Sequence, residues 1–561
     1  MSLSPLASRS VPGRPLTLGT EDAAPAVAST EQPKLNPETA ALIERAKNRA
    51  GIRHDLSPLQ TDIAREAVEG TGHVVIEAVA GSGKSFTLRL LAYVLSLAMG
   101  QFRGLAVAFN KSIADELGKK LKGTNFWAKT MHSQAYFNLR RGRPDLTFNI
   151  EGDKYRDICA EYVENSVTVE IPASVEPDPI ARERMQAARK KEIARNLQQL
   201  VGLVRLNLIS PSDIEAVTNL ALHHDLDAEA CAEHVAPVLT IGNRLADETG
   251  LIDFDDMLYL PLLWKVRFTK FKIVLADECQ DFNPAQLEVI LRCLDKNGRI
   301  FFVGDRKQAI YGFAGADHRS FQSIIERSKA TVMPLSVTYR CPVSHVRLAQ
   351  QIVPHIQAAP GAAEGTVRRI ERDDVAKEVR PGNLILCRLN APLVSLCIEM
   401  IAQKIQARVK GADIGKRMIG ILRQIEQIEG YSFDQIGQFI DTWAANQIAF
   451  LESKGASDSS LSRITDMRDA LDVCVRSFAG CRSVDCLADE IAALFADETA
   501  AVWLSSVHRA KGLEAEQVMI LRDDKMPLRF PDQQDWELEQ EWNLRYVALT
   551  RSTDTLTFIN D

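Results

Sequence analysis

The sequence lacks the features that mark membrane proteins and disulfide-stabilised secreted proteins. None of its apolar runs approaches the roughly 20 residues that a membrane-spanning helix needs. Its ten cysteines follow no paired spacing, which predicts free thiols in a reducing compartment. The closest cluster is Cys474, Cys481 and Cys486, whose spacing matches no zinc-binding template. We therefore predict buried free thiols there rather than a metal site.

An excess of positive charge is also missing. The 67 Lys and Arg residues face 74 Asp and Glu residues, which gives a formal net charge of -7. Nucleic-acid binding, if present, would therefore depend on basic groups that are concentrated locally. The chain has 561 residues, of which 46% are hydrophobic and 25% charged. These values are typical of a globular protein with several domains.

A phosphate-binding loop is indicated near the start of the ordered pattern. Apolar, mostly β-branched residues predict a buried strand over Val74–Val79, and the turn Gly81–Gly83 follows it. Lys84 and Ser85 then open a segment with the apolar spacing of a helix. In this context Lys84 would reach the β- and γ-phosphates of a nucleotide, and the Ser85 hydroxyl would bind Mg²⁺. Ala78 stands where the usual motif has its first glycine, and the alternative is a chance Gly-Ser turn before a helix.

Two further apolar strands are followed by polar residues that suit the same chemistry. The strand over Ile273–Leu275 leads to Asp277 and Glu278, which predicts a metal ligand and a general base. The strand over Ile300–Val303 leads to Gln308, which would orient water or sense the γ-phosphate. The alternative for the two acids is a solvated turn.

Other candidates are weaker when each is taken alone. Gln60, in a helix that Ser57 would cap, would read an adenine edge or be a solvated surface residue. Thr130 and His132 follow a predicted strand, where ligands meet open parallel sheets, but such residues are more often structural. Phe313, between glycines, would stack on a nucleobase or belong to the core.

The chain divides into alternating α/β and helical parts. Residues 1–50, rich in Ser, Pro and Ala, predict a disordered tail. Strand and helix patterns alternate over 51–139 and 249–335, and again over 336–409 and 498–561. Residues 140–248 and 410–497 are predicted to be mainly helical. The basic stretch Arg182–Arg205 would form either a nucleic-acid face or a solvated helix face.

Taken in order, these motifs resemble those of superfamily 1 DNA helicases of the UvrD/Rep type, with some likeness to the F-box DNA helicase branch. The matching segments are LSPLQ, AVAGSGKS, AFNKSIADEL, KTMHSQAY, DFDDML, LADECQD, VGDRKQAIYGFAGAD, LSVTYR, SSVHRAKGLE and NLRYVALTRS. The resemblance implies a P-loop NTPase with two RecA-like parallel-sheet motor domains. The helical parts would then be one insertion in each motor domain.

The resemblance also implies a role for each candidate residue. Lys84, Glu278, Gln308, Arg340 and Arg551 would be catalytic, with the two arginines acting as fingers from the second domain. Gln60 would bind adenine, Tyr339 would stack on it, and Glu514 would contact the ribose. Ser85 and Asp277 would hold the metal. The phosphate-loop contacts would be Ala80, Gly81, Ser82, Gly83, Lys84, Ser85 and Phe86. The single strand would meet Phe109, Asn110, Thr130, His132, Phe313 and His508.

The implied activity is ATP- and Mg²⁺-dependent movement along single-stranded DNA or from single/double-strand junctions, 3′→5′, in repair, recombination or replication. The alternatives are an ATP-gated DNA-binding module or a protein-stripping translocase that does not unwind. The residues alone leave DNA and RNA both open. We expect a monomer or weak oligomer in the cytoplasm of a bacterium or phage host, or in the nucleus if the source is eukaryotic. No membrane partner is expected, and the identity of any recruiting protein stays open.

Overall fold

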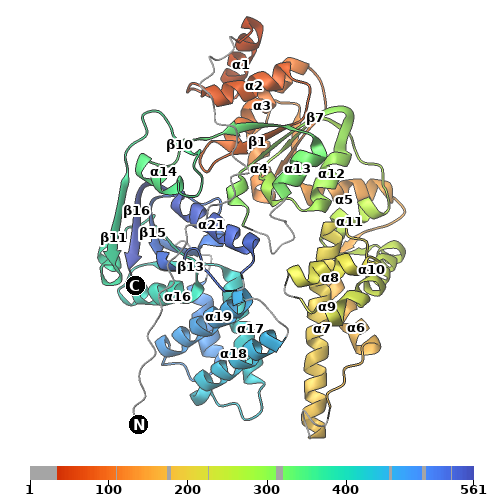
Figure 1. Cartoon of the computed structure of the whole chain (residues 1–561), viewed down its shortest axis with the longest axis vertical. Coiled ribbons are helices and arrows are strands. Elements are labelled where there is room, and N and C mark those ends of the chain that lie inside the picture. The colour runs from red at the N-terminus through yellow and green to blue at the C-terminus, as the bar shows by residue number, and fades with distance from the viewer. Residues whose placement is uncertain are drawn as a thin grey trace, which may run out of the picture.

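The computed structural model describes residues 35–108, 110–172, 178–224, 226–310, 320–453, 458–495, 501–531 and 533–560. They form two lobes, each built on a six-stranded parallel sheet, and each lobe carries a helical insertion (Figure 1). The predicted α/β class with two parallel sheets is therefore confirmed. Within the described ranges, no helix combines the length and the apolar character needed to cross a membrane.

The first lobe has the sheet order β3-β2-β6-β7-β1-β8. Helices cover both faces, so its inner strands are apolar on both sides, which explains why they could be predicted as continuous apolar runs. Because the strands are parallel, the residues that follow β1, β6 and β7 lie at one edge of the sheet. The strands are β1 (Val74–Ala78), β2 (Gly104–Ala108), β3 (Phe126–Thr130), β6 (Phe271–Ala276), β7 (Leu294–Gly304) and β8 (Thr331–Leu335). The helices are α1 (Pro37–Arg49), α2 (Pro58–Glu69), α3 (Lys84–Met99), α4 (Lys111–Lys120), α5 (Met131–Gly142), α11 (Asp256–Leu263), α12 (Pro284–Cys293) and α13 (Ser320–Ser328).

The second lobe has the sheet order β11-β16-β15-β12-β14-β13. Its last helix, α21 (Asp535–Leu549), faces the first lobe (Figure 1). A short parallel pair, β9 (Val337–Thr338) with β10 (Gln357–Ala358), joins the lobes. The strands are β11 (Thr366–Glu371), β12 (Leu384–Cys387), β13 (Ala407–Lys410), β14 (Val502–Ser506), β15 (Ala515–Leu521) and β16 (Ser552–Asn560). The other helices are α14 (Val343–Ala349), α15 (Val375–Glu378) and α16 (Asn390–Ala402).

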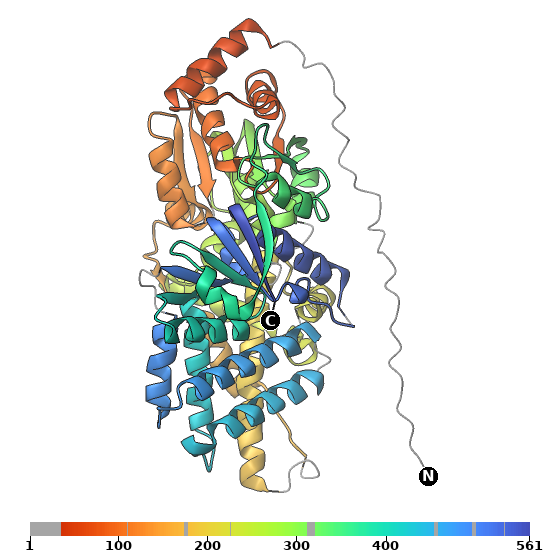
Figure 2. The same cartoon turned by 90° about the vertical axis from the view of Figure 1, so that its left-hand side faces the viewer.

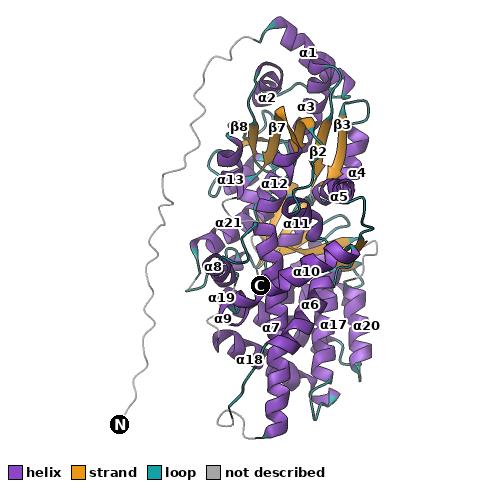
Figure 3. Cartoon of the chain, turned by 90° about the vertical axis from the view of Figure 1, so that its right-hand side faces the viewer, coloured by secondary structure: helices purple, strands orange, loops and turns teal. Residues whose placement is uncertain are grey.

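The two insertions extend toward the same end of the molecule and lie side by side (Figures 2 and 3). The long helix α7 of the first insertion reaches the second, where Arg184 pairs with Glu429 at 2.6 Å. The first insertion contains β4 (Asn149–Ile150), α6 (Lys154–Ser166), α7 (Pro179–Asn207), α8 (Ile214–His223), α9 (Ala228–Cys231), α10 (Val235–Thr249) and β5 (Leu251–Ile252). The second contains α17 (Ala412–Glu426), α18 (Ile436–Ser453), α19 (Asp458–Ser477) and α20 (Val484–Leu494).

A buried charge cluster ties the first insertion to its lobe. The Arg205 guanidinium contacts Asp253 and Asp256 at 2.8 Å, and the Lys154 ammonium contacts Asp256 at 2.6 Å. Arg205 and Lys154 are both almost fully buried. Arg205 therefore belongs to the interior, and the predicted nucleic-acid face of Arg182–Arg205 does not include it.

The N-terminal prediction is wrong for α1. The expected tail through residue 50 ends earlier, because α1 is an ordered helix capped by Asn36. Ile43 and Ala46 of α1 are buried in the same core as α3. The helix has few apolar residues of its own, so its stability depends on this tertiary packing. Residues 1–34 lie outside the described part of the chain.

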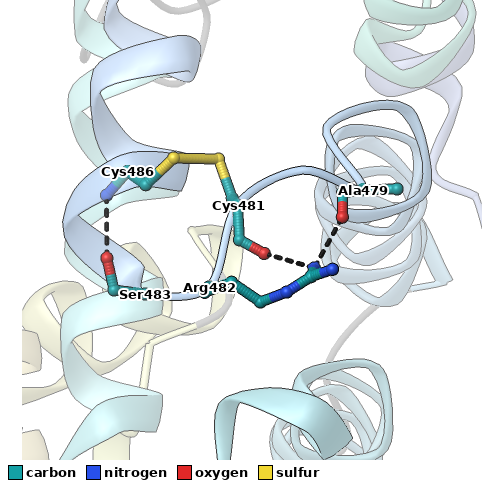
Figure 4. Close-up of a disulfide and its surroundings, with 5 residues drawn as sticks. All are labelled: Ala479, Cys481, Arg482, Ser483 and Cys486. Carbon is teal, nitrogen blue, oxygen red and sulfur yellow. Dashed lines mark hydrogen bonds between the residues drawn. A yellow bond between two sulfur atoms is a disulfide. The ribbon is translucent and has the colours of Figure 1, made fainter.

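The prediction of free thiols is wrong for Cys481 and Cys486, which form a disulfide at the start of α20 (Figure 4). The two residues are five positions apart, and the turn between α19 and α20 brings their Cα atoms to 5.5 Å. Arg482 donates to the carbonyls of Ala479 and Cys481, which holds this turn. Cys474 and the remaining cysteines are free and buried, as predicted.

Candidate active site at the lobe interface

One cavity of about 510 Å³ opens between the two lobes and collects most of the predicted nucleotide-site residues. The first lobe contributes the phosphate loop, the acids after β6 and Gln308. The second lobe contributes the two predicted arginine fingers. Its walls are formed by Gly81, Ser82, Gly83, Lys84, Ser85, Phe86, Ile113, Glu116, Leu117, Lys120, Asp277, Glu278, Gln308, Tyr339, Arg340, Gly512, Glu514, Arg551 and Thr553.

The phosphate loop has the predicted strand–turn–helix form. Gly81 and Gly83 have φ angles of 70° and 85°, which L side chains rarely adopt. A Cβ on Gly81 would also lie 2.5 Å from the Cβ of Arg340, so the glycine permits close approach of the second lobe. Lys84 begins α3, and the free backbone N–H groups of its first turn suit an anion. Ala78 is the last residue of β1, where extended backbone does not require glycine.

The two acids after β6 differ in their surroundings. Burial, then the neighbouring Glu278, raises the pKa of Asp277 to about 7. The pKa of Glu278 is lowered. Burial acts to raise it, but the positive charges of Lys84 and Lys511 and a hydrogen bond from Gln280 together have the larger effect. The Lys84 ammonium lies 3.8 Å from Glu278 Oε1, and Gln280 Nε2 donates to Glu278 Oε2 at 2.6 Å. Glu278 is therefore held ionised, as a general base must be.

The donor set around Asp277 fits Mg²⁺. Carboxylate and hydroxyl oxygens are the ligands that Mg²⁺ prefers, and Asp277 and Ser85 line the same cavity. Among the described residues, no three His, Cys, Asp or Glu side chains are grouped so that they would hold a metal by themselves. Magnesium in nucleotide sites is commonly held by one or two protein ligands together with water and substrate phosphates, which matches this arrangement.

Gln308 is buried and fixed by neighbours from both lobes. Its Nε2 donates to Asp305 Oδ2 at 2.7 Å, while its backbone carbonyl accepts from Lys511 Nζ at 2.8 Å. Lys511 also pairs with Asp281 at 2.5 Å. The residue predicted to sense the γ-phosphate is thus connected to the second lobe.

The two arginines from the second lobe reach the cavity in different ways. Arg340 pairs with Glu514 at 2.6 Å and lies against the phosphate loop. Arg551 is 1% exposed, and it donates to the carbonyls of Val547 and Leu513 at 2.9 and 3.3 Å. Burial, then the nearby Arg340, lowers the pKa of Arg551 to about 10, so the group stays charged at neutral pH. Glu514 lines the same cavity and contacts Arg340, and its role at the ribose stays a prediction.

Of the two predicted adenine contacts, Tyr339 lines the cavity and Gln60 lies beside Gly83, which also lines it. The Tyr339 side chain lines it and is 51% exposed, which leaves the ring available for stacking. Gln60 is buried, so it is not the solvated surface residue of the alternative interpretation. Its Oε1 accepts from the Ser57 backbone in a capping box, and its Nε2 lies near Gly83. The adenine role of Gln60 stays a prediction.

The predicted DNA contacts are not brought together in the same way. Asn110 and Thr130 cap helices α4 and α5, accepting from the backbone N–H groups of Ile113 and Ser133. Their side-chain oxygens therefore have local structural partners, as is common for such residues at helix starts. Phe109 and Phe313 lie outside the described residues.

The two predicted histidines are uncharged near neutral pH. Burial lowers the pKa of His132. Burial, followed by Arg388, Arg463 and Arg509, lowers the pKa of His508 to about 3. Arg388 and Arg509 are themselves paired with Glu541 and Asp413, so they are not free cations around His508. The roles of both histidines in DNA contact stay predictions.

Sequence reasoning missed the residues that reach the cavity from helices. α4 contributes Ile113, Glu116, Leu117 and Lys120, and the second lobe adds Gly512 from a turn and Thr553 from β16. Tyr546 of α21 also touches the phosphate loop. Strand-end position is a signal for loop residues, whereas contacts made by helix faces depend on tertiary packing.

Comparison with known proteins identifies the chain's relatives. Residues 59–329 match the UvrD/REP helicase N-terminal domain, and residues 318–560 match the UvrD-like helicase C-terminal domain. The chain belongs to the UvrD/REP helicase family. The predicted resemblance is confirmed, and the two parallel sheets are the RecA-like motor domains of a UvrD/REP protein.

Individual UvrD/REP relatives are distant and longer. An ATP-dependent DNA helicase PcrA of Staphylococcus epidermidis is 25% identical over 311 residues, 52% of this chain and 39% of that protein. An ATP-dependent DNA helicase UvrD2 of Mycobacterium tuberculosis is 26% identical over 337 residues, 55% of this chain and 45% of that protein. The chain thus matches less than half the length of each relative.

Proposed function

We propose that this chain is an ATP-driven motor that moves along single-stranded DNA, hydrolysing ATP in the cavity between its lobes. The composition of that cavity carries the proposal. Lys84 and Glu278 line it from the first lobe, while Arg340 and Arg551 line it from the second. A polyphosphate bound there would contact both lobes, so its hydrolysis would change the attraction between them. The family membership and the names of the relatives support ATP and DNA as the partners.

Each residue has a role that follows from its position. Lys84 would bind the β- and γ-phosphates, and Glu278 would take a proton from the attacking water. Arg340 and Arg551 would stabilise the charge that develops on the transferred phosphoryl group. Mg²⁺ on Asp277 and Ser85 would neutralise phosphate charge. The adenine would lie against Tyr339.

A groove between the two insertions is the candidate path for the single strand. It has a volume of about 1570 Å³ and combines five arginines, one of them the buried Arg205, with side-chain amides and aromatic rings. Phe254, which is 60% exposed, suits stacking on a base. Three acids also line the groove, so its charge is mixed. The other arginines and the aromatic members are Arg189, Arg195, Arg417, Arg463, Tyr155, Phe254 and Phe450.

Replacing Arg195 and Arg417 together by alanine should weaken binding of single-stranded DNA. Both side chains are exposed and line opposite sides of the groove. If each arginine neutralises one phosphate, the decrease of log affinity with log salt should become less steep by about 0.7 for each arginine removed. Arg347→Ala, which removes an exposed arginine of α14 paired with Glu364, is the matched control. Equal salt slopes in the double variant and the control would remove this groove from the DNA path.

The function itself is tested by the nucleic acid that stimulates ATP hydrolysis. We expect single-stranded DNA to raise the turnover number of the full chain, and RNA of the same sequence to raise it less. Displacement of a paired strand, and of a protein bound to a single strand, should then be measured beside each other. Protein displacement without strand displacement would support the protein-stripping translocase. A rate of ATP hydrolysis that neither DNA nor RNA changes would contradict the motor proposal.

A further inference from the structure

A tyrosine of the second lobe is buried inside the candidate active site. Tyr546 lies on α21, and its side chain is fully buried. Its hydroxyl accepts a hydrogen bond from the backbone N–H of Ala80 in the phosphate loop at 2.8 Å. The same hydroxyl donates to Asp305 Oδ2 at 3.4 Å, at the end of β7. One phenol therefore connects two strand ends of the first lobe.

The Asp305 end of this bridge continues to the predicted catalytic residues. Asp305 Oδ2 also accepts from Gln308 Nε2 at 2.7 Å, and the Asp305 N–H donates to Gln280 Oε1 at 3.0 Å. Gln280 Nε2 in turn donates to Glu278 Oε2 at 2.6 Å. A continuous set of direct hydrogen bonds thus joins the phosphate loop, Tyr546, Gln308 and Glu278.

The rest of the same helix face holds the segment that follows. Glu539 pairs with Lys307 at 2.6 Å. Gln540 and Asn543 donate to the backbone carbonyls of Ile310 and Ala309 at 2.8 and 3.0 Å. With Tyr546, these side chains fall on one side of α21, at spacings of three to four residues. α21 therefore lies along residues 305–310, a segment that precedes the predicted base contact Phe313 in the sequence.

We infer that Tyr546 is a positioning residue, which sets the phosphate loop and the Asp305–Gln308 segment in register from the second lobe. The inference rests on the proposed function, because it concerns the same hydrolysis. The phenol would transmit movement between the lobes to Gln308 and Glu278, without touching the nucleotide through its hydroxyl. Burial keeps the pKa of Tyr546 well above its ordinary value, so the hydroxyl retains the proton that it donates to Asp305.

The test is Tyr546→Phe in the full chain. Phenylalanine keeps the ring in the apolar cluster that includes Val79 and Cys341, but leaves the Ala80 N–H and the Asp305 carboxyl without this partner. Losing this buried hydroxyl and leaving its two partners unsatisfied should lower the DNA-stimulated turnover number about tenfold or more, with the KM for ATP within about twofold. Tyr162→Phe is the matched control, because it removes a hydroxyl that contacts His234 in the first insertion.

Several results would overturn the inference. One is a Tyr546→Phe turnover number within about twofold of the wild-type value. Another is a parallel change in turnover, KM and thermal midpoint, which would indicate a purely structural role. These results are distinct from a failure of the proposed function. If the wild-type chain shows no DNA-stimulated hydrolysis, the motor proposal fails. If DNA stimulates the wild-type chain and Tyr546→Phe has the same turnover number, only the positioning role fails.

Discussion

Lys84→Ala should abolish DNA-stimulated ATP hydrolysis, lowering the turnover number by about 10²–10³ or more. The Lys84 ammonium is placed at the start of α3, inside the cavity and 3.8 Å from Glu278. A charge in this position stabilises phosphate oxygens throughout the reaction, so alanine should also weaken ATP binding. The turnover number, the KM for ATP and the affinity for a fluorescent ATP analogue measure both effects.

Lys120→Ala is the matched control for this prediction. Lys120 lines the same cavity, but it lies on α4 and pairs with Glu116 of its own helix at 2.5 Å. An exposed ion pair of this kind contributes little to stability, so we expect the rate of ATP hydrolysis to be nearly unchanged. Survival of DNA-stimulated hydrolysis in Lys84→Ala would show that the phosphate loop has been assigned wrongly. A similar loss in both variants would indicate that the whole cavity wall, rather than Lys84, is sensitive.

The parts of the fold that could be predicted are those with a strong local signal. β1, β6 and the second half of β7 are buried and appear in the sequence as apolar runs, and α2 begins at a Ser-Pro cap. The two outer strands of the second sheet, β11 and β13, were not predicted. β11 has the sequence TVRRIE and is largely exposed, because an edge strand has one open side. Its alternation is too weak to distinguish it from a loop.

The same distinction applies to the site. Asp277, Glu278 and Gln308 follow predicted strands, and parallel strands bring their carboxyl ends to one edge. Tyr546 is 466 residues from Ala80 in sequence, and no local pattern indicates that the two touch. The predictions for α1 and for Cys481 and Cys486 were wrong for a related reason, since the helix and the disulfide both depend on how neighbouring elements pack. Residue type predicts chemistry at strand ends, whereas contacts between lobes require coordinates.

Arg340→Ala should lower the turnover number by about 10³-fold or more while ATP binding remains largely intact. Arg340 comes from the second lobe and lies so close to the phosphate loop that a side chain at Gly81 would collide with it. The loop and Lys84 would still bind the phosphates in the variant, but charge developing in the transition state would lose a guanidinium. Single-turnover hydrolysis and equilibrium binding of an ATP analogue separate the two quantities.

The contact between Arg340 and Glu514 sharpens this prediction. The two groups are 2.6 Å apart, so the guanidinium must exchange Glu514 for a phosphate when the nucleotide is bound. Glu514→Gln should therefore leave turnover closer to wild type than Arg340→Ala does, because it frees the finger instead of removing it. Arg347→Ala, which breaks another Arg–Glu pair of the second lobe, controls for the general effect of losing an exposed ion pair. Equal loss of binding and turnover in Arg340→Ala would mean that Arg340 acts on the ground state, and Arg551 would then be the remaining candidate finger.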